Sequence, residues 1–127
     1  MSRRGMQLAA GVAMMLCGEV AGASDLTIHL QGSGAVERKT VKYQCDAQGA
    51  KMGLPTGPFA VEYLNGAPNF LVVVPVKGNS QIFVTVPSGS GAKYASGQFT
   101  WWEAQGAVTF YSDFPGPKMN SSCKVVK

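Results

Sequence analysis

The chain has 127 residues, about the length of one domain, and a formal net charge of +4 at pH 7 from 11 basic and 7 acidic residues. This small charge is spread thinly, without a basic cluster or a nucleic-acid-binding motif, which argues against a nucleic-acid partner. One histidine and scattered carboxylates form no triad, metal cluster or phosphate loop, so the sequence predicts a protein that is not an enzyme and that uses no metal or cofactor.

Residues 1–23 have the features of a secretory signal peptide. Arg3 and Arg4 form a basic start, and residues 8–16 are an uncharged apolar run that is too short to span a membrane stably. The run is followed by an Ala-Gly-Ala sequence, which is a small-x-small cleavage site. Cleavage after Ala23 predicts a periplasmic protein.

A lipid anchor is the alternative for this leader. Cys17 could accept a lipid, but Leu16 occupies the position at which that signal requires a small residue. The sequence therefore favours a protein that is not anchored in a membrane.

Two cysteines remain after the leader, Cys45 and Cys123. An even number of cysteines in an exported chain predicts a disulfide, and the single histidine leaves a metal site without further ligands. In the chain-entropy model, closing a loop of this length stabilises the fold by about 4 kcal/mol.

The rest of the chain divides into a flexible lead-in, residues 24–35, and one domain, residues 36–127. The domain alternates short apolar or amphipathic segments with turns rich in glycine, proline and asparagine. Pro75 indicates an edge or a bulge, and residues 46–58 are expected to be turns. The predicted strands are 36–45, 59–64, 70–76, 81–86, 99–103, 108–112 and 123–126.

These strands predict a small all-β, single-domain antiparallel barrel. No window keeps helical periodicity, and 16 glycines and 7 prolines argue against long helices. Closure into a barrel is favoured because it removes the unpaired edges of a sheet.

Residues 88–94 form the most distinctive segment of the chain. Ser88, Gly89, Ser90 and Gly91 have almost no side-chain bulk, so the backbone can turn tightly and approach another surface. Large apolar groups follow at Phe99, Trp101 and Trp102 and can anchor such a loop to a strand. By itself, this composition favours a plain hairpin connection.

Together with the two cysteines, the Ser-Gly-Ala-Lys-Tyr sequence at 90–94 and the tryptophan pair at 101–102 resemble the bacterial inhibitors of c-type lysozyme. The resemblance spans residues 39–123. It implies an eight-stranded barrel whose loop enters the cleft of a c-type lysozyme, with Ser90 at the two catalytic carboxyl groups. Tyr94 would brace the loop or fill a sugar subsite. The implied lysozyme-binding residues are Ser88, Gly89, Ser90, Gly91, Ala92, Lys93, Tyr94, Trp102 and Ala104.

One position departs from the family pattern. In that pattern a Lys-Gly pair follows the aromatic pair, and here the lysine position falls on Ala104. The resemblance therefore implies either a weaker inhibitor or a substitute cation such as Lys93.

Two other functions stay open, a barrel that holds a small apolar ligand and a module that binds carbohydrate through an exposed tryptophan. Adjacent residues of a strand face opposite sides, so one of Trp101 and Trp102 is expected in the core. The other either contacts a partner or packs on the surface. The lead-in also leaves a homodimer open.

Overall fold

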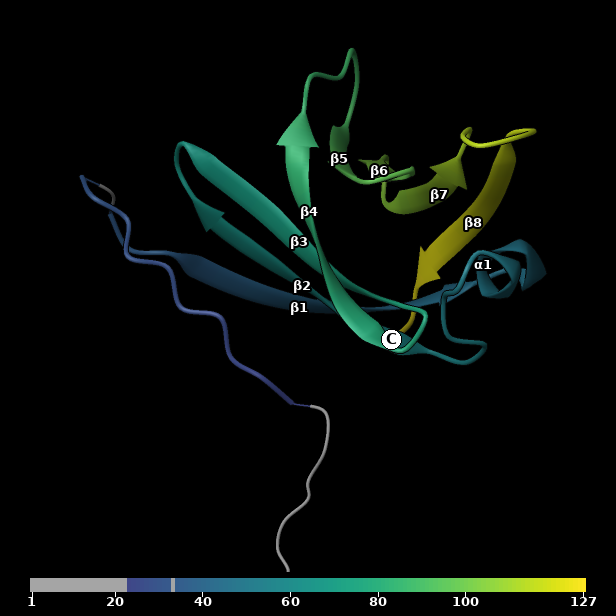
Figure 1. Ribbon diagram of the computed structural model, residues 1–127, viewed down its shortest axis with the longest axis horizontal. Coiled ribbons are helices and arrows are strands. Elements are labelled where there is room, and N and C mark those ends of the chain that lie inside the picture. The colour runs from purple at the N-terminus through teal and green to yellow at the C-terminus, as the bar shows by residue number, and fades with distance from the viewer. Residues whose placement is uncertain (1–22, 33) are drawn as a thin grey trace, which may run out of the picture. The chain divides into compact units, whose positions relative to one another are not determined.

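The computed structural model describes residues 23–32 and 34–127 (Figure 1). Residues 1–22 of the predicted signal peptide, which include Cys17, lie outside the described residues. Contacts divide the chain into one unit that ends at Gln31 and a second unit, Gly32–Lys127, which holds the predicted domain. Within the described part of the chain, no helix is long and apolar enough to cross a membrane.

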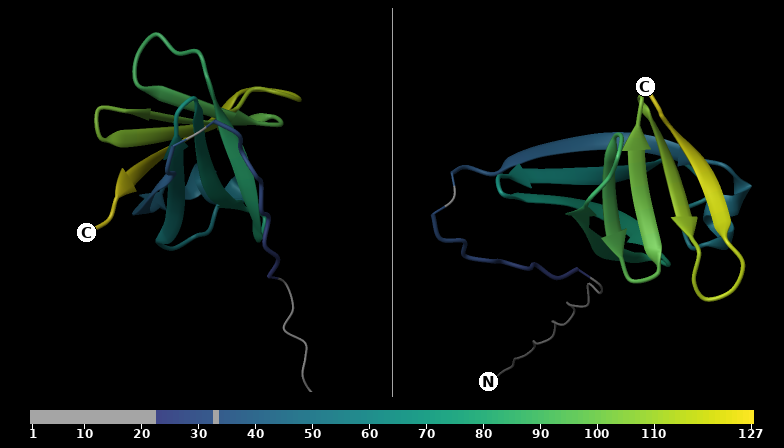
Figure 2. Two further views of the ribbon diagram at one scale, coloured as in Figure 1. Left: turned by 90° about the vertical axis from the view of Figure 1, so that its left-hand side faces the viewer. Right: turned by 90° about the horizontal axis from the view of Figure 1, so that it is seen from above.

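The second unit is a closed antiparallel barrel with the strand order β1-β2-β3-β4-β5-β6-β7-β8, which confirms the predicted fold class. Every strand pairs with its neighbour in sequence, and β1 pairs with β8 to close the barrel (Figures 1 and 2). The elements are β1 (Glu37–Cys45), α1 (Ala47–Lys51), β2 (Phe59–Gly66), β3 (Asn69–Val76), β4 (Asn79–Val86), β5 (Ala92–Ser96), β6 (Phe99–Ala104), β7 (Ala107–Ser112) and β8 (Met119–Val125).

Side chains alternate between the interior and the outer surface of the barrel, as strand geometry requires. In β3, for example, Val72 and Val74 are fully buried, whereas Leu71 and Val73 between them are only partly buried on the outer face. The largest interior side chains, which include Trp101, Phe83 and Phe110, belong to one packed cluster. The interior is therefore a hydrophobic core, and this packing does not favour a barrel that holds an apolar ligand.

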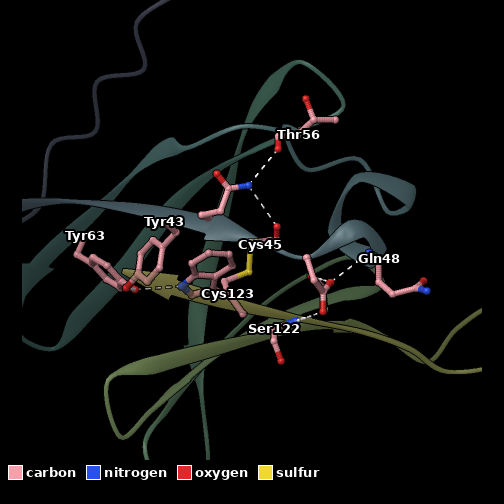
Figure 3. Close-up of a disulfide and its surroundings, with 11 residues drawn as sticks. Tyr43, Cys45, Gln48, Thr56, Tyr63, Ser122 and Cys123 are labelled. Atoms are coloured by element: carbon pink, nitrogen blue, oxygen red, sulfur yellow. Dashed lines mark hydrogen bonds between the residues drawn. A yellow bond between two sulfur atoms is a disulfide. The ribbon is translucent and has the colours of Figure 1, made fainter. Parts of the chain in front are cut away.

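Three aromatic side chains in this core also form hydrogen bonds. The hydroxyls of Tyr43 and Tyr63 lie 2.8 Å apart, and the indole Nε1–H of Trp101 donates to the Tyr63 hydroxyl at 3.0 Å (Figure 3). Burial raises the pKa of the Tyr63 hydroxyl well above its usual value. The polar atoms that these large rings bring into the core are thus satisfied by one another.

The seam between β1 and β8 is short, with only three paired positions. Cys45 and Cys123 lie opposite each other at one end of this seam and form the predicted disulfide across 78 positions of sequence (Figure 3). A covalent bond across a loop of this length stabilises the fold by about 4 kcal/mol. The disulfide thus strengthens the barrel where few strand pairs close it.

Asp46 reinforces the same seam from the end of β1. Its carboxylate accepts from the Gln48 amide at 3.1 Å and so caps α1. The same carboxylate accepts from the Ser121 hydroxyl at 2.7 Å and from the Ser122 amide at 3.1 Å, both in β8. One side chain therefore joins the short helix to the closing strand.

Local structure differs from expectation in two segments. Residues 46–58 were expected to be turns, but residues 47–51 form α1, which the Asp46 cap initiates. Residues 92–96 form β5, which no predicted strand covered, because their alternation is only five residues long. Pro75 of β3 pairs with Ser80 of β4, but the pairing of β3 with β2 ends at Val73. On its β2 side Pro75 therefore lies at a local strand edge, one of the two positions expected for this proline.

We expect Asp46→Ala to lower the free energy of unfolding by about 1 kcal/mol at neutral pH, because it removes a helix cap and the links to β8. The hydrogen bond from Ser121, followed by that from the Ser122 amide, holds the pKa of Asp46 below its usual value. A carboxyl with a depressed folded-state pKa stabilises the fold above its unfolded pKa, and this contribution disappears as the pH falls through the folded pKa.

The difference in the free energy of unfolding between wild type and Asp46→Ala should therefore become smaller as the pH falls below about 4. Urea unfolding followed by circular dichroism over a pH series measures it, with Asp113→Ala, an exposed carboxylate in another loop, as the matched control. A difference that stays constant down to the lowest pH at which the protein folds would contradict this account.

Candidate functional site

The connection between β4 and β5, residues 87–91, projects beyond the ends of the neighbouring strands (Figures 1 and 2). Ser88, Gly89, Ser90 and Gly91 are all exposed. The predicted loop is therefore a narrow, accessible tip on a rigid barrel, and we call residues 88–91 the tip.

The backbone of the tip is held in place by side chains. The carbonyl of Ser90 accepts a hydrogen bond from the Ser88 hydroxyl at 2.5 Å. The same carbonyl accepts from the indole Nε1–H of Trp102 in β6 at 3.0 Å. Because Trp102 belongs to the barrel wall, its hydrogen bond fixes the tip to the sheet.

Gly91 joins the tip to the wall and has a φ of 64°, in the left-handed region that favours glycine. A Cβ at this position would meet the backbone oxygen of Glu103 and would lie 2.8 Å from the Cβ of Ala104. Glycine is thus required both by the backbone angle and by the close approach of β6. This contact brings the loop and Ala104, which the sequence predicted as parts of one site, to the same place.

Lys93 and Trp102 lie opposite each other in the β5–β6 register and on the outer face of the barrel. The Nζ of Lys93 is 4.8 Å from the centre of the Trp102 ring, a cation–π distance. Beyond it, Lys118 lies 4.8 Å from the ring of Tyr111. The sequence predicted Lys93 and Trp102 as site residues but not Tyr111 or Lys118. The outward alternation of β7 was the only signal for Tyr111, and Lys118 lies in the connection between β7 and β8, where no pattern marked it.

Tyr94 points inward, and only 6% of its surface is exposed. Its ring packs against the ring of Tyr63 with the centres 6.0 Å apart. Burial, and to a smaller extent the negative charge of Glu103, raise the pKa of the Tyr94 hydroxyl. Of the two roles expected for Tyr94, this position fits the bracing of the loop and not the filling of a sugar subsite.

Trp101 is fully buried and Trp102 is half-buried on the outer face, so Trp101 is the core member of the pair. The outer tryptophan holds the tip and is covered by Lys93. Among the described residues, no group of three or more histidine, cysteine or acidic side chains could hold a metal. The arrangement is suited to binding through a projecting, hydroxyl-bearing tip.

Comparison with known proteins identifies similar chains. A family model described as membrane-bound lysozyme-inhibitor of c-type lysozyme matches residues 43–118. A membrane-bound lysozyme inhibitor of C-type lysozyme from Pseudomonas aeruginosa is 41% identical over 98 residues, which are 75% of this chain and 71% of the relative. A protein of the same description from Cupriavidus necator is 36% identical over 64 residues, which are 50% of this chain and 45% of the relative.

A solved structure is similar over most of the chain as well. This is the crystal structure of Pseudomonas aeruginosa MliC in complex with hen egg white lysozyme. The two folds superimpose with a TM-score of 0.64 at 33% sequence identity, over 84% of this chain and 100% of the other. The similarity therefore includes the barrel fold.

We expect Gly91→Ala to destabilise the protein by about 1 to 2 kcal/mol, because a side chain is strained at positive φ and here also meets β6. Gly89→Ala is the matched control, since a Cβ at Gly89 would meet nothing within 4 Å. Thermal unfolding measures the effect. Equal stability of the two variants would show that the tip is not held as described.

Proposed function

Because this chain belongs to the family of membrane-bound inhibitors of c-type lysozyme, we propose that it inhibits a c-type lysozyme by inserting its tip into the substrate cleft. The observation that supports this most directly is the exposed tip on a rigid base, in a fold similar to that of a lysozyme-bound relative. Inhibition would protect the peptidoglycan of the cell that exports the protein.

Ser90 is the residue proposed to contact the catalytic groups. Lysozymes cleave the glycosidic bond with two carboxyl groups, one a protonated acid and the other ionised. A serine hydroxyl can accept a hydrogen bond from the first and donate one to the second. The carbonyl of Ser90 is already bonded to Ser88 and Trp102, which leaves the hydroxyl as the group to offer.

The fixed backbone of the tip supports tight binding. A loop that is ordered before it binds loses little conformational entropy in the complex. Trp102 and Gly91 supply that order, the first by its hydrogen bond and the second by its close fit against β6. In this proposal Trp102 is a positioning residue, and its ring, which Lys93 covers, does not serve as a platform for sugars.

We place the protein in the bacterial envelope, on the periplasmic side. The leader in residues 1–23 supports export. The relatives are named membrane-bound, so they lend no support to the expectation that the chain lacks a lipid anchor. Lipid attachment at Cys17 is compatible with the proposed inhibition, since residues 18–36 would separate the anchor from the first strand of the barrel.

The protein as exported, mixed with hen egg white lysozyme, should slow the lysis of cell walls in a turbidity assay. Ser90→Ala should weaken inhibition about tenfold or more, because a hydrogen bond to a charged group contributes about 1.5 to 3 kcal/mol. Ser122→Ala, an exposed serine in β8, is the matched control and should inhibit like wild type. Undiminished lysis at several-fold molar excess would refute inhibition, and equal potency of both variants would refute the role of Ser90.

Ala104 offers a test in the opposite direction. It lies beside Gly91 at the base of the tip. The resemblance in sequence places the family's lysine at this position. We expect Ala104→Lys to strengthen inhibition several-fold, because an added cation would face the ionised carboxylate of the cleft. The gain should fall at high salt, as expected for a charge pair that water can reach. The control Gln105→Lys, in the adjacent turn, adds the same charge and should strengthen inhibition less. An equal increase in inhibition for both variants would point to net charge as the cause.

A further inference from the structure

The fold gathers lysines that are separated in sequence on the outer side of strands β5 to β8. Lys93 faces outward beside the buried Tyr94, and Lys124 faces outward beside the buried Cys123. Lys118 is exposed immediately before β8. The sequence spreads its charge thinly, so this grouping is a product of the strand order.

Two aromatic rings hold two of these ammonium groups over the sheet. The Nζ of Lys93 lies 4.8 Å from the centre of the Trp102 ring and 6.0 Å from that of the Tyr111 ring. The Nζ of Lys118 lies 4.8 Å from the centre of the same Tyr111 ring. Cation–π contacts of this kind restrict where a flexible side chain places its charge, so both charges converge on one ring. We call Lys93, Trp102, Tyr111, Lys118 and Lys124 the basic face.

The basic face has no carboxylate of its own to neutralise it. Among the described residues, the one salt bridge joins Arg38 to Glu62, away from this face. Glu103 is the only acidic residue within β5 to β8, and it faces inward because it follows the outward Trp102 in β6. Asp113, in the connection between β7 and β8, is exposed and forms no salt bridge. A cationic surface without counter-ions is complementary to an anionic partner.

The remainder of this surface is polar, which narrows the choice of anionic partner. The outward positions around the two rings carry small or hydrogen-bonding side chains, among them Thr100, Thr109 and Asn120. A surface that enters a bilayer presents large apolar groups to the lipid, and here ammonium groups cover both rings. The basic face is therefore suited to a hydrated polymer that carries repeated negative charges, and not to a lipid surface.

We propose that the basic face binds the carboxylates of peptidoglycan, the polymer that the proposed inhibitor protects. The peptide stems of peptidoglycan repeat their carboxylates, so several individually weak pairs with the lysines act together. The tip projects beyond the strand ends, whereas the basic face lies on the side of the barrel, so both surfaces are available at once (Figures 1 and 2). Such binding holds the inhibitor at the polymer that lysozyme attacks. It requires the proposed envelope location but not the inhibition itself.

Co-sedimentation with insoluble peptidoglycan, in the absence of lysozyme, tests the proposal on the exported protein. We expect binding that weakens as salt is added and that is lost when the carboxyl groups of the polymer are converted to amides. Lys93→Gln combined with Lys118→Gln should raise the apparent dissociation constant about fivefold. The matched control, Lys51→Gln combined with Lys77→Gln, removes two exposed lysines outside the basic face and should bind like wild type. Absence of binding, equal weakening in both double variants, or binding that survives amidation would overturn the proposal.

Two further measurements separate the basic face from a lipid-binding surface and from the tip. Vesicles of anionic phospholipid should bind more weakly than peptidoglycan, and equal or tighter binding to the vesicles would overturn the choice of partner. Lys118 lies beside Met119, at the opposite end of strands β5 to β8 from the tip. Lys118→Gln alone should therefore weaken binding to peptidoglycan but inhibit lysozyme like wild type on a soluble oligosaccharide substrate, with circular dichroism to confirm the fold. Unchanged binding of this variant to peptidoglycan would contradict the role of Lys118, whatever the outcome for inhibition.

Discussion

The closure of the barrel between β1 and β8 is the constraint on which the rest of the structure depends. Three paired positions are a weak link in a sheet of eight strands, and the disulfide between Cys45 and Cys123 makes that link covalent. Asp46 extends the closure by binding both the start of α1 and the backbone of β8. The closed barrel excludes water from the aromatic core and keeps its side chains packed. A packed core in turn holds β4, β5 and β6 in place, and these strands carry the tip and the side chain that binds it.

The adjacent tryptophans connect this core to the tip. Trp101 fills the interior and donates to Tyr63, while Trp102 faces outward and donates to the backbone of Ser90. Because the two tryptophans are adjacent in β6, the strand that is anchored in the core also carries the ring that binds the tip. The position of the tip is therefore set by core packing as well as by the loop itself. Tyr94 contributes from β5, the strand that follows the tip, where it packs inside the barrel against Tyr63.

Much of the fold followed from the sequence, because period-two alternation, turn residues and a pair of cysteines are local or countable features. The helix α1 did not follow, because its five residues are too few to show helical periodicity and include Gly49, although its Asp46 cap is a local contact. Strand β5 is too short to show its period and is defined by its pairing with β6. At the site, the small residues of the tip were recognisable, but the bond from Trp102 to Ser90 depends on which tryptophan faces outward, and alternation alone left that open.

The two tryptophans also give the molecule a pair of built-in optical reporters with separate environments. Trp101 is shielded from solvent and hydrogen-bonded inside the barrel, so its fluorescence follows the integrity of the core. Trp102 lies partly open to water beneath an ammonium group, and its indole is bonded to the tip, so its emission responds to whatever the tip touches. Replacing either one by phenylalanine isolates the other signal, and loop events can then be followed apart from unfolding without attaching a dye.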